Sequence, residues 1–285
     1  MINKRLFTLF LLGFALTLLV ACNGTDSNQS SANEESNPPT SMPANNSDHQ
    51  DMDNHEDSEV PHWSYEGEGG PDHWAELDNA YEACGAGLEQ SPIDLTGSSA
   101  ADLVNITFNY AESDVNILNN GHTIQVNYDE GSSIEIEGHT YNLVQFHFHA
   151  PSEHAIDGSL YPIEMHLVHA DANGNLAVVG VFVTQGAENT AFTAVWDNLP
   201  AEETDAVATG MMVNAAELLP ADQLFYRYNG SLTTPPCSEG VLWSVMAAPI
   251  EMSAEQIAAF TTIFDGNNRP LQPLNDRDLQ LDETP

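Results

Sequence analysis

The chain has 285 residues, of which 41% are hydrophobic, and it carries 43 acidic residues against five basic ones. The formal net charge of −38 at pH 7 argues against nucleic acid and anionic membrane surfaces as partners, because both repel such a protein. About 225 residues follow the polar N-terminal part, which is enough for one domain with a full core.

The first 21 residues are typical of a secretory signal. Lys4 and Arg5 precede an apolar run, residues 6–20, which is too short for a comfortable membrane span. The run ends in Leu-Val-Ala-Cys at Cys22, which resembles a bacterial lipobox, with cleavage before the cysteine and lipid on its sulfur. We therefore expect a protein exported and anchored to a bacterial membrane, on the periplasmic or cell-surface side. An ordinary signal peptide with a cysteine nearby is the alternative.

Residues 22–60 are rich in Asn, Ser, Asp, Glu and Pro and hold almost no large apolar side chain. Such a segment cannot bury enough surface to offset the entropy cost of ordering, so we expect an acidic, disordered tether. His49 and His55 lie among its carboxylates, where a weak metal-collecting role is conceivable. A solvated tail is the favoured interpretation, and residues 61–285 are expected to form one folded domain.

Short apolar or alternating runs dominate residues 61–285 and predict β-strands. Helices are predicted only at 190–199 and at 253–264, where Ser253 is the expected N-cap. The sequence thus favours a mainly β fold, of the α+β type, with small surface helices. The strands are expected at Val104–Tyr110, Thr123–Tyr128, Ile134–Ile136, Leu143–His149, Ile163–His169, Ala177–Thr184 and Val241–Ala247.

Two of these strands carry histidines at alternate positions. His147 and His149 share one face of the strand at 143–149, because side chains alternate along a strand. A hairpin-like return over residues 155–162 would bring His166 of the next strand beside them. Three neutral nitrogen ligands with an open fourth position describe a catalytic Zn²⁺ site rather than a closed structural one.

A His-x-His pair alone is a weak signal, but polar residues precede the candidate ligands on both strands. Gln145 and Glu164 each lie two positions before a candidate ligand. Either side chain can accept the other ring N–H of that ligand, which fixes the tautomer and raises basicity. His154, beside Glu153, and His169, on the opposite strand face, are interpreted as structural.

Residues 61–279 resemble the alpha-class carbonic anhydrases in a series of motifs that occur in that family's order. The resemblance implies one central, twisted, mostly antiparallel sheet of about ten strands. The motifs are His62-Trp63-Ser64-Tyr65, Gln90-Ser91-Pro92-Ile93-Asp94, Asn119-Asn120-Gly121-His122, Gln145 to His154, Leu232-Thr233-Thr234-Pro235-Pro236 and Asn268-Arg269-Pro270-Leu271-Gln272-Pro273.

The same resemblance implies the reversible hydration of carbon dioxide to bicarbonate and a proton, by a hydroxide that Zn²⁺ activates. Thr233 matches the family's gatekeeper threonine, whose hydroxyl donates to a carboxylate, here Glu153. His122 occupies the position of the proton shuttle, and an imidazole titrates close to neutral pH. The resemblance further implies a substrate wall of Val168, Val178, Leu232 and Trp243, a bicarbonate contact at Thr234, and a proton path along Tyr65, Asn120 and Gln125.

Cys84 and Cys237 are the cysteines that remain once Cys22 is assigned to lipid. An even pair in an exported domain predicts a disulfide. Secreted members of the family carry one between the equivalent motifs. The bond would also restrain the loop that holds Thr233.

Two other functions fit part of the sequence. One is an acatalytic binding protein, as in family members that have lost a zinc histidine, and the other is a zinc-scavenging surface lipoprotein. All three expected ligands are present, which favours the enzyme. The sequence leaves the oligomeric state open between a monomer and a homodimer.

The mature chain would keep only three basic residues, Arg227, Arg269 and Arg277, and no lysine. The carboxylates of such an acidic surface repel one another. We therefore expect a halophilic protein that works in a salty environment, where ions screen the repulsion.

Overall fold

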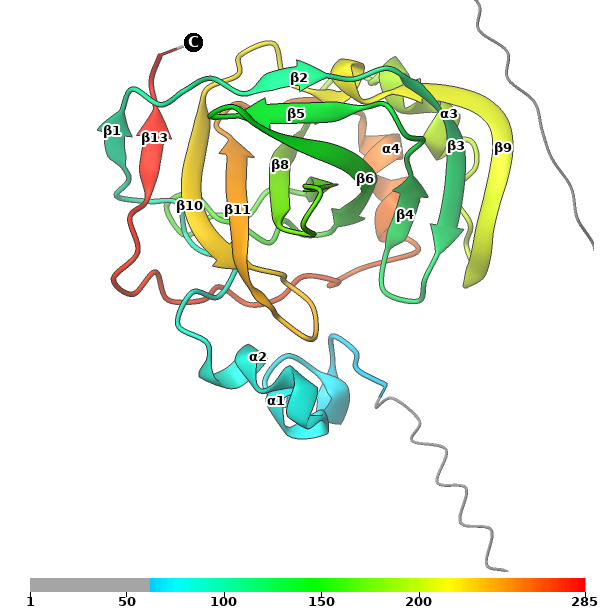
Figure 1. Ribbon diagram of the computed structural model, residues 1–285. Coiled ribbons are helices and arrows are strands. Elements are labelled where there is room, and N and C mark those ends of the chain that lie inside the picture. The colour runs from blue at the N-terminus through cyan, green and yellow to red at the C-terminus, as the bar shows by residue number, and fades with distance from the viewer. Residues whose placement is uncertain (1–61, 285) are drawn as a thin grey trace, which may run out of the picture. The chain divides into compact units, whose positions relative to one another are not determined.

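The computed structural model describes residues 62–284, shown in Figure 1. The predicted signal segment, the lipidation site at Cys22 and the acidic tether therefore lie outside the described residues. One large sheet with a few short helices makes up the described chain, which confirms the predicted mainly β class. Over residues 62–284, no helix is both long and apolar enough to cross a bilayer.

The sheet contains thirteen strands, ten of them in one continuous path in the order β1-β13-β10-β11-β8-β7-β6-β4-β3-β9. Most neighbours are antiparallel, but β1–β13, β11–β8 and β12–β8 are parallel pairs. The strands are β1 (Ser99–Ala101), β2 (Thr107–Asn109), β3 (Glu112–Asn119), β4 (Ile124–Asn127), β5 (Ser133–Ile136), β6 (His139–His149), β7 (Ile163–Ala170), β8 (Leu176–Gln185), β9 (Thr204–Asn214), β10 (Phe225–Ser231), β11 (Glu239–Met246), β12 (Ile250–Met252) and β13 (Gln280–Asp282).

The longest helix is α4 (Ala254–Thr261), and it begins as the sequence predicts. The Ser253 hydroxyl accepts from the Gln256 N–H, and the Gln256 side chain accepts from the Ser253 N–H, forming a capping box. The helix predicted at 190–199 is shorter, with a 3-10 turn, η3 (Thr190–Phe192), leading into α3 (Thr193–Trp196). The other short helices are η1 (Gly67–Gly69), α1 (Trp74–Leu77), η2 (Asn79–Tyr81), α2 (Ala83–Ala86) and η4 (Ala215–Leu218).

The sheet is buried on both faces near its centre, because alternate residues of β8 enter two different hydrophobic clusters. Val179, Val181 and Val183 belong to the larger cluster, whereas Val178 and Phe182 belong to the smaller one. All five side chains are at most 2% exposed. This explains why β8 reads as a continuous apolar run rather than an alternating one.

The histidine-bearing strands use the same alternation to aim their imidazoles. On β6, Phe146 and Phe148 enter the larger cluster, whereas His147 and His149 point to the opposite face. On β7, His166 likewise lies between two residues of the larger cluster. The larger core therefore holds the backbone of both strands while leaving one face of each free for polar chemistry.

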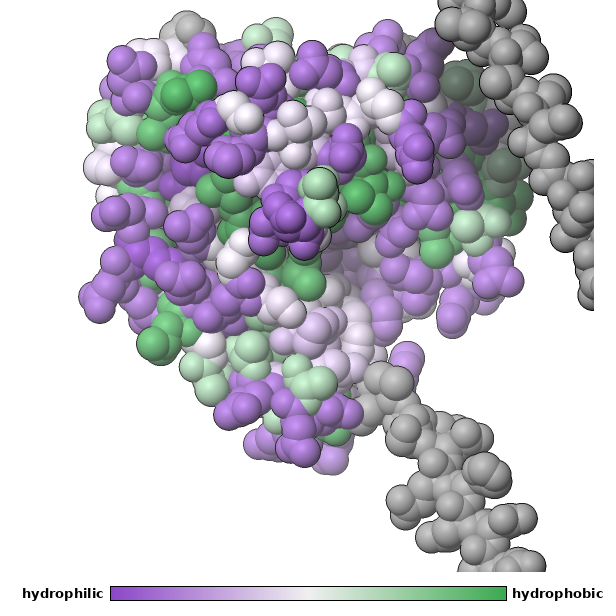
Figure 2. Space-filling view, viewed as in Figure 1, coloured by the Kyte–Doolittle hydropathy of each residue, from purple (hydrophilic) through white to green (hydrophobic). Residues whose placement is uncertain are grey.

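Acidic side chains of the described residues find few cationic partners. Figure 2 shows a face covered mostly by hydrophilic side chains with small apolar areas between them. Within residues 62–284, only histidines lie within 4.0 Å of carboxylates as ion pairs, and none of the three arginine side chains does. Arg269 instead donates to Gln90, Ser91 and Cys84 oxygens. Internal pairing with arginine therefore does little to offset the acidic charge.

We predict that the melting temperature rises between low salt and molar sodium chloride. Raising ionic strength shortens the Debye length from about 10 Å at 0.1 M to about 3 Å at 1 M, which screens repulsion among surface carboxylates. Thermal denaturation of the full chain and of a chain beginning near Pro61 measures the effect. The shorter chain should keep the response, and a melting temperature that is flat or falls with salt would contradict the halophilic expectation.

Candidate functional site

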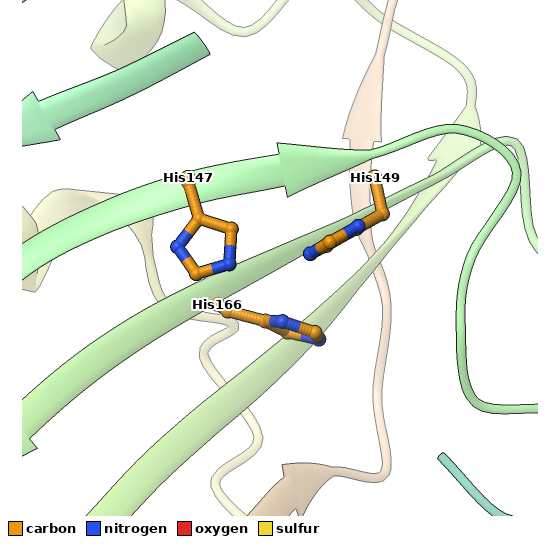
Figure 3. A group of neighbouring side chains, drawn as sticks. All are labelled: His147, His149 and His166. Atoms are coloured by element: carbon orange, nitrogen blue, oxygen red, sulfur yellow. The ribbon is translucent and has the colours of Figure 1, made fainter. Parts of the chain in front are cut away.

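Three imidazoles meet on one face of the sheet, as Figure 3 shows. His147 on β6 lies directly opposite His166 on β7, and His149 is two residues further along β6. The ring centroids are 5.0 Å apart for His147–His149, 5.3 Å for His147–His166 and 4.7 Å for His149–His166. One nitrogen of each ring lies within 4.8 Å of the others, so the three could hold a metal ion.

Hydrogen bonds orient the two β6 rings. Nδ1 of His147 lies 2.9 Å from Oε1 of Gln145 and can donate to it. Nδ1 of His149 donates to the carbonyl oxygen of Asn267 at 2.7 Å. With Nδ1 engaged in both rings, Nε2 is the nitrogen left to face the centre of the cluster.

The third ring is oriented in the opposite sense, by a buried carboxylate. Nε2 of His166 donates to Oε1 of Glu164 at 2.9 Å, which leaves Nδ1 for the centre. Oε1 also accepts from Nδ1 of His154 at 2.7 Å, and Oε2 accepts the N–H groups of Glu153 and His154. Burial raises the pKa of Glu164, but His154 and His166 hold that pKa well below its ordinary value.

His154 completes this network rather than joining the cluster of His147, His149 and His166. Its Nε2 accepts from the hydroxyl of Tyr228 at 2.6 Å. His154, Glu164 and His166 also lie close enough to hold an ion, but their facing atoms already bond to each other. His169 is elsewhere, with Nε2 accepting from Tyr110 at 2.8 Å.

The cluster of His147, His149 and His166 fits Zn²⁺. Nε2 of His149 is buried and has no hydrogen-bond partner in the described chain, so a ligand at this point would satisfy it. Burial lowers the pKa of His147 and of His149, which keeps both rings in the neutral form that binds metal. Three imidazole nitrogens with no fourth protein ligand are the donor set of catalytic zinc sites.

Glu153 lies beneath the cluster and is only partly satisfied. Its Oε1 accepts the Arg269 N–H at 2.9 Å, whereas its Oε2 is buried with no hydrogen-bond partner within residues 62–284. Thr233 is 6% exposed, and the hydrogen bond expected between its hydroxyl and Glu153 is absent from these described residues. The structure thus leaves one carboxylate oxygen free for such a donor.

A cleft of about 130 Å³ opens beside the imidazoles. Asn120 supplies a turn at its edge, since its Oδ1 accepts the N–H groups of His122 and Thr123. Gln125 donates to Oδ1 of Asn127 at 2.7 Å, which fixes its amide. The lining residues are Trp63, Tyr65, Asn120, His122, Thr123, Gln125, Gln145, His147, His149 and Thr234.

His122 stacks on the indole of Trp63, with ring centroids 3.7 Å apart and an interplanar angle of 9°. Burial, with a further contribution from His62, lowers the pKa of His122, and Glu203 opposes this shift. The ring is half-buried in the cleft wall. It is therefore held in one place and is neutral at neutral pH.

The four residues expected to form the apolar wall are packed in the smaller cluster of the core. Val178 and Trp243 are buried there, and Val168 and Leu232 pack against it. The Trp243 ring lies 4.8 Å from the ring of His166. The wall therefore adjoins the imidazole cluster, although it does not line the cleft described above.

The predicted disulfide between Cys84 and Cys237 is present, with Cα atoms 5.0 Å apart. The N–H of Cys237 donates to the carbonyl oxygen of Thr234 at 2.8 Å. The bond therefore fastens the loop that carries Thr233 to the segment around α2.

Sequence reasoning missed three contributors to this site. The Asn267 carbonyl gives no signal because every residue has one, Trp63 was noted only as part of a motif, and the hydroxyl of Tyr228 comes from the unpredicted strand β10. The sequence signals that could have found them were weak. Asn267 immediately precedes one motif and Trp63 lies inside another.

Comparisons with known proteins agree with this geometry. The sequence model of eukaryotic-type carbonic anhydrases matches residues 69–282. A carbonic anhydrase of Nostoc sp. strain PCC 7120 is 47% identical over 223 residues, which are 75% of this chain and 84% of that protein.

Solved structures give the same result. A hyperthermostable carbonic anhydrase from an active hydrothermal vent chimney has a TM-score of 0.75 at 49% identity, over 78% of this chain and all of that one. The alpha-carbonic anhydrase of Thermovibrio ammonificans, solved with the inhibitor sulfanilamide, has a TM-score of 0.75 at 44% identity, over 77% of this chain and 99% of that one. The chain therefore belongs to the eukaryotic-type, or alpha, carbonic anhydrase family, and its activity is that of a carbonic anhydrase.

Proposed function

We propose that the chain hydrates carbon dioxide reversibly to bicarbonate and a proton, with Zn²⁺ held by Nε2 of His147, Nε2 of His149 and Nδ1 of His166. The observation that carries this proposal is the convergence of these three nitrogens within 4.8 Å, each on a ring whose other nitrogen is hydrogen-bonded. Zn²⁺ bound by three neutral imidazoles supplies a hydroxide nucleophile at neutral pH, because it lowers the pKa of a bound water.

Hydrogen-bond acceptors beside the three histidines set which ring nitrogen each histidine offers to the metal. Gln145 and the Asn267 carbonyl accept from the β6 ligands and so fix their tautomers. Glu164 does the same for His166, with a charged carboxylate in place of a neutral carbonyl oxygen. We assign all three acceptors a positioning role.

Thr233 and Glu153 orient the attacking oxygen. The free Oε2 of Glu153 would accept from the Thr233 hydroxyl, whose own oxygen is then left only to accept. The attacking hydroxide would donate its one hydrogen to the Thr233 oxygen. A lone pair of the hydroxide would then point toward the substrate rather than toward the protein. Carbon dioxide is apolar and is assigned to the wall of Val168, Val178, Leu232 and Trp243, with Thr234 contacting bicarbonate.

His122 accepts the proton that each turnover releases. It lines the same cleft as His147 and His149 and is stacked on Trp63, so water between them can carry the proton. Tyr65, Asn120 and Gln125 line the same cleft and would order that water. The neutral form of His122 is the acceptor, and its lowered pKa favours that form.

We further propose that the protein is exported and anchored to a bacterial membrane, on the periplasmic or cell-surface side, by lipid on Cys22. This assignment rests on the signal-like residues 1–21 and the Leu-Val-Ala-Cys ending. Carbon dioxide crosses bilayers because it is uncharged. An enzyme anchored to the membrane would therefore act where the gas enters or leaves the cell.

The first prediction concerns the ligand set. His147→Ala, His149→Ala and His166→Ala should each lose most zinc and most activity, because two imidazoles hold the ion poorly. Gln145→Ala should bind zinc about 10–100-fold more weakly, as is usual when a ligand loses its orienting partner. Metal analysis and stopped-flow hydration measure both effects. His139→Ala, an exposed residue at the start of β6, is the control. Full activity in a zinc-free His149→Ala protein would end this proposal.

The second prediction concerns the shuttle. His122→Ala should slow the maximal rate in weak buffer by up to about 100-fold, the low end for general acid–base catalysis, because water still carries some protons. Added imidazole should restore the rate. Burial lowers the pKa of His122, so the shuttle-dependent rate should persist as pH falls to about 6.5, the ordinary imidazole value, and decline only below it. If imidazole leaves the variant slow, His122 does not carry the proton.

The third prediction concerns the anchor. Cys22→Ser should release the protein from the membrane fraction or block its processing, because the lipid-bearing sulfur is gone. Fractionation of expressing cells, with mass spectrometry of the mature N-terminus, tests this. A native protein that is exported, soluble and free of lipid would show that residues 1–21 are an ordinary signal peptide.

A further inference from the structure

A second cavity, of about 340 Å³, shares no lining residue with the cleft beside the imidazoles. Its walls come from β10, β11 and β13, from the segments before and after β1, from the turn between β5 and β6, and from the segment before β13. Its volume lies at the lower end of the range of small-molecule sites. Two of the three arginines of the described chain line it, Arg227 and Arg277.

Arg227 is a buried cation with no carboxylate partner, and its guanidinium lies 4.8 Å from the centroid of the Phe225 ring. Its side chain, on β10, is 8% exposed, and its Nε donates to the Ser244 hydroxyl at 3.1 Å. Its Nη2 is buried and makes no hydrogen bond to any residue from 62 to 284, and no carboxylate of these residues lies within 4.0 Å. A buried charge left in this state costs free energy that a bound anion would recover.

The neighbouring groups do not fill this role. Asp282 lies on the next strand of the sheet, but its Oδ1 already accepts from Leu103 and Thr284. Arg277 donates from all its guanidinium nitrogens to backbone carbonyl oxygens. Arg227 is therefore the one arginine of the described residues that lines a cavity and has a buried guanidinium nitrogen, Nη2, without a hydrogen-bond partner.

Three carboxylates line the same cavity at exposed positions, those of Glu89, Glu137 and Asp278. A simple anion on the arginine would be repelled by these carboxylates, and a simple cation among them would be repelled by the arginine. A molecule with a carboxylate at one end and an ammonium at the other matches both sets of charges. Guanidinium binds carboxylate through two parallel hydrogen bonds, and the exposed acids suit the ammonium.

We propose that this cavity binds a small zwitterion of the α-amino-acid class. The carboxylate of the ligand would sit on the free donors of Arg227, and its ammonium group among Glu89, Glu137 and Asp278. The proposal does not rest on the zinc chemistry, since the cavity shares no lining residue with the cleft beside the imidazoles. One lining residue, Tyr228, also bonds to His154, but the proposed ligand contacts do not involve it.

Calorimetric titration of the zinc-loaded full chain in low-salt buffer tests this with three probes. Glycine carries both charges, acetate only the negative one, and methylammonium only the positive one. Glycine should bind saturably, and the other two at least about 10-fold more weakly, since each loses one charge-assisted set of hydrogen bonds. Absence of glycine binding, or acetate binding as tight as glycine, would overturn the proposal.

Variants separate the two ends of the site. Arg227→Met should abolish glycine binding while leaving carbon dioxide hydration unchanged. Glu137→Gln should weaken glycine binding yet strengthen acetate binding, because it removes a charge that attracts the ammonium group and repels the carboxylate. Glu217→Gln, the same charge change at an exposed residue outside the cavity, should alter neither. If Arg227→Met does not fold, the Glu137→Gln variant still tests the proposal through its opposite effects on glycine affinity and acetate affinity. A change of both affinities in the same direction would refute the assignment.

Discussion

The buried carboxylate of Glu164 is the interaction on which the rest of the site depends. It receives four hydrogen bonds, two from imidazoles and two from backbone N–H groups of the loop at Glu153 and His154. One group thus sets the ring of His166, holds His154 against the core, and fixes the loop that presents Glu153. A carboxylate at 0% exposure is tolerable only because each of its oxygens is satisfied in this way. Loss of its charge would loosen both the ring of His166 and the loop that presents Glu153.

The sequence predicted the site best where side chains alternate regularly between the two faces of a strand. Alternation in β6 and β7 predicted which histidines share a face, and the orienting residues Gln145 and Glu164 could be found because they lie two positions away on the same strand face. The backbone acceptor of His149 could not be found, since it comes from 118 residues further along the chain. Strand β9 was missed for a different reason. Most of its residues are exposed on both faces, so no hydrophobic alternation marks it.

The arginines show how an acidic protein uses its few cations. Arg269 and Arg277 serve as tethers, because they hold the C-terminal segment to residues 84–91 and to Asn229 through backbone and amide oxygens rather than through carboxylates. Carbonyl acceptors carry only partial charge, so these contacts do not weaken when salt screens full charges. Arg269 and Arg277 thus hold segments of the chain together, whereas most carboxylates are hydrated at the surface.

The position of β13 has a consequence for how the molecule is made. This strand, Gln280–Asp282, lies between β1 and β10 in the sheet, so it joins residues near position 100 to residues near position 226. Contacts so distant in sequence form slowly, because a long loop must close before they do. Until residue 282 is available, β10 presents an unpaired edge that neighbouring nascent chains could join. Mutual repulsion between chains of net charge −38 would keep such incomplete molecules apart for the time that closure requires.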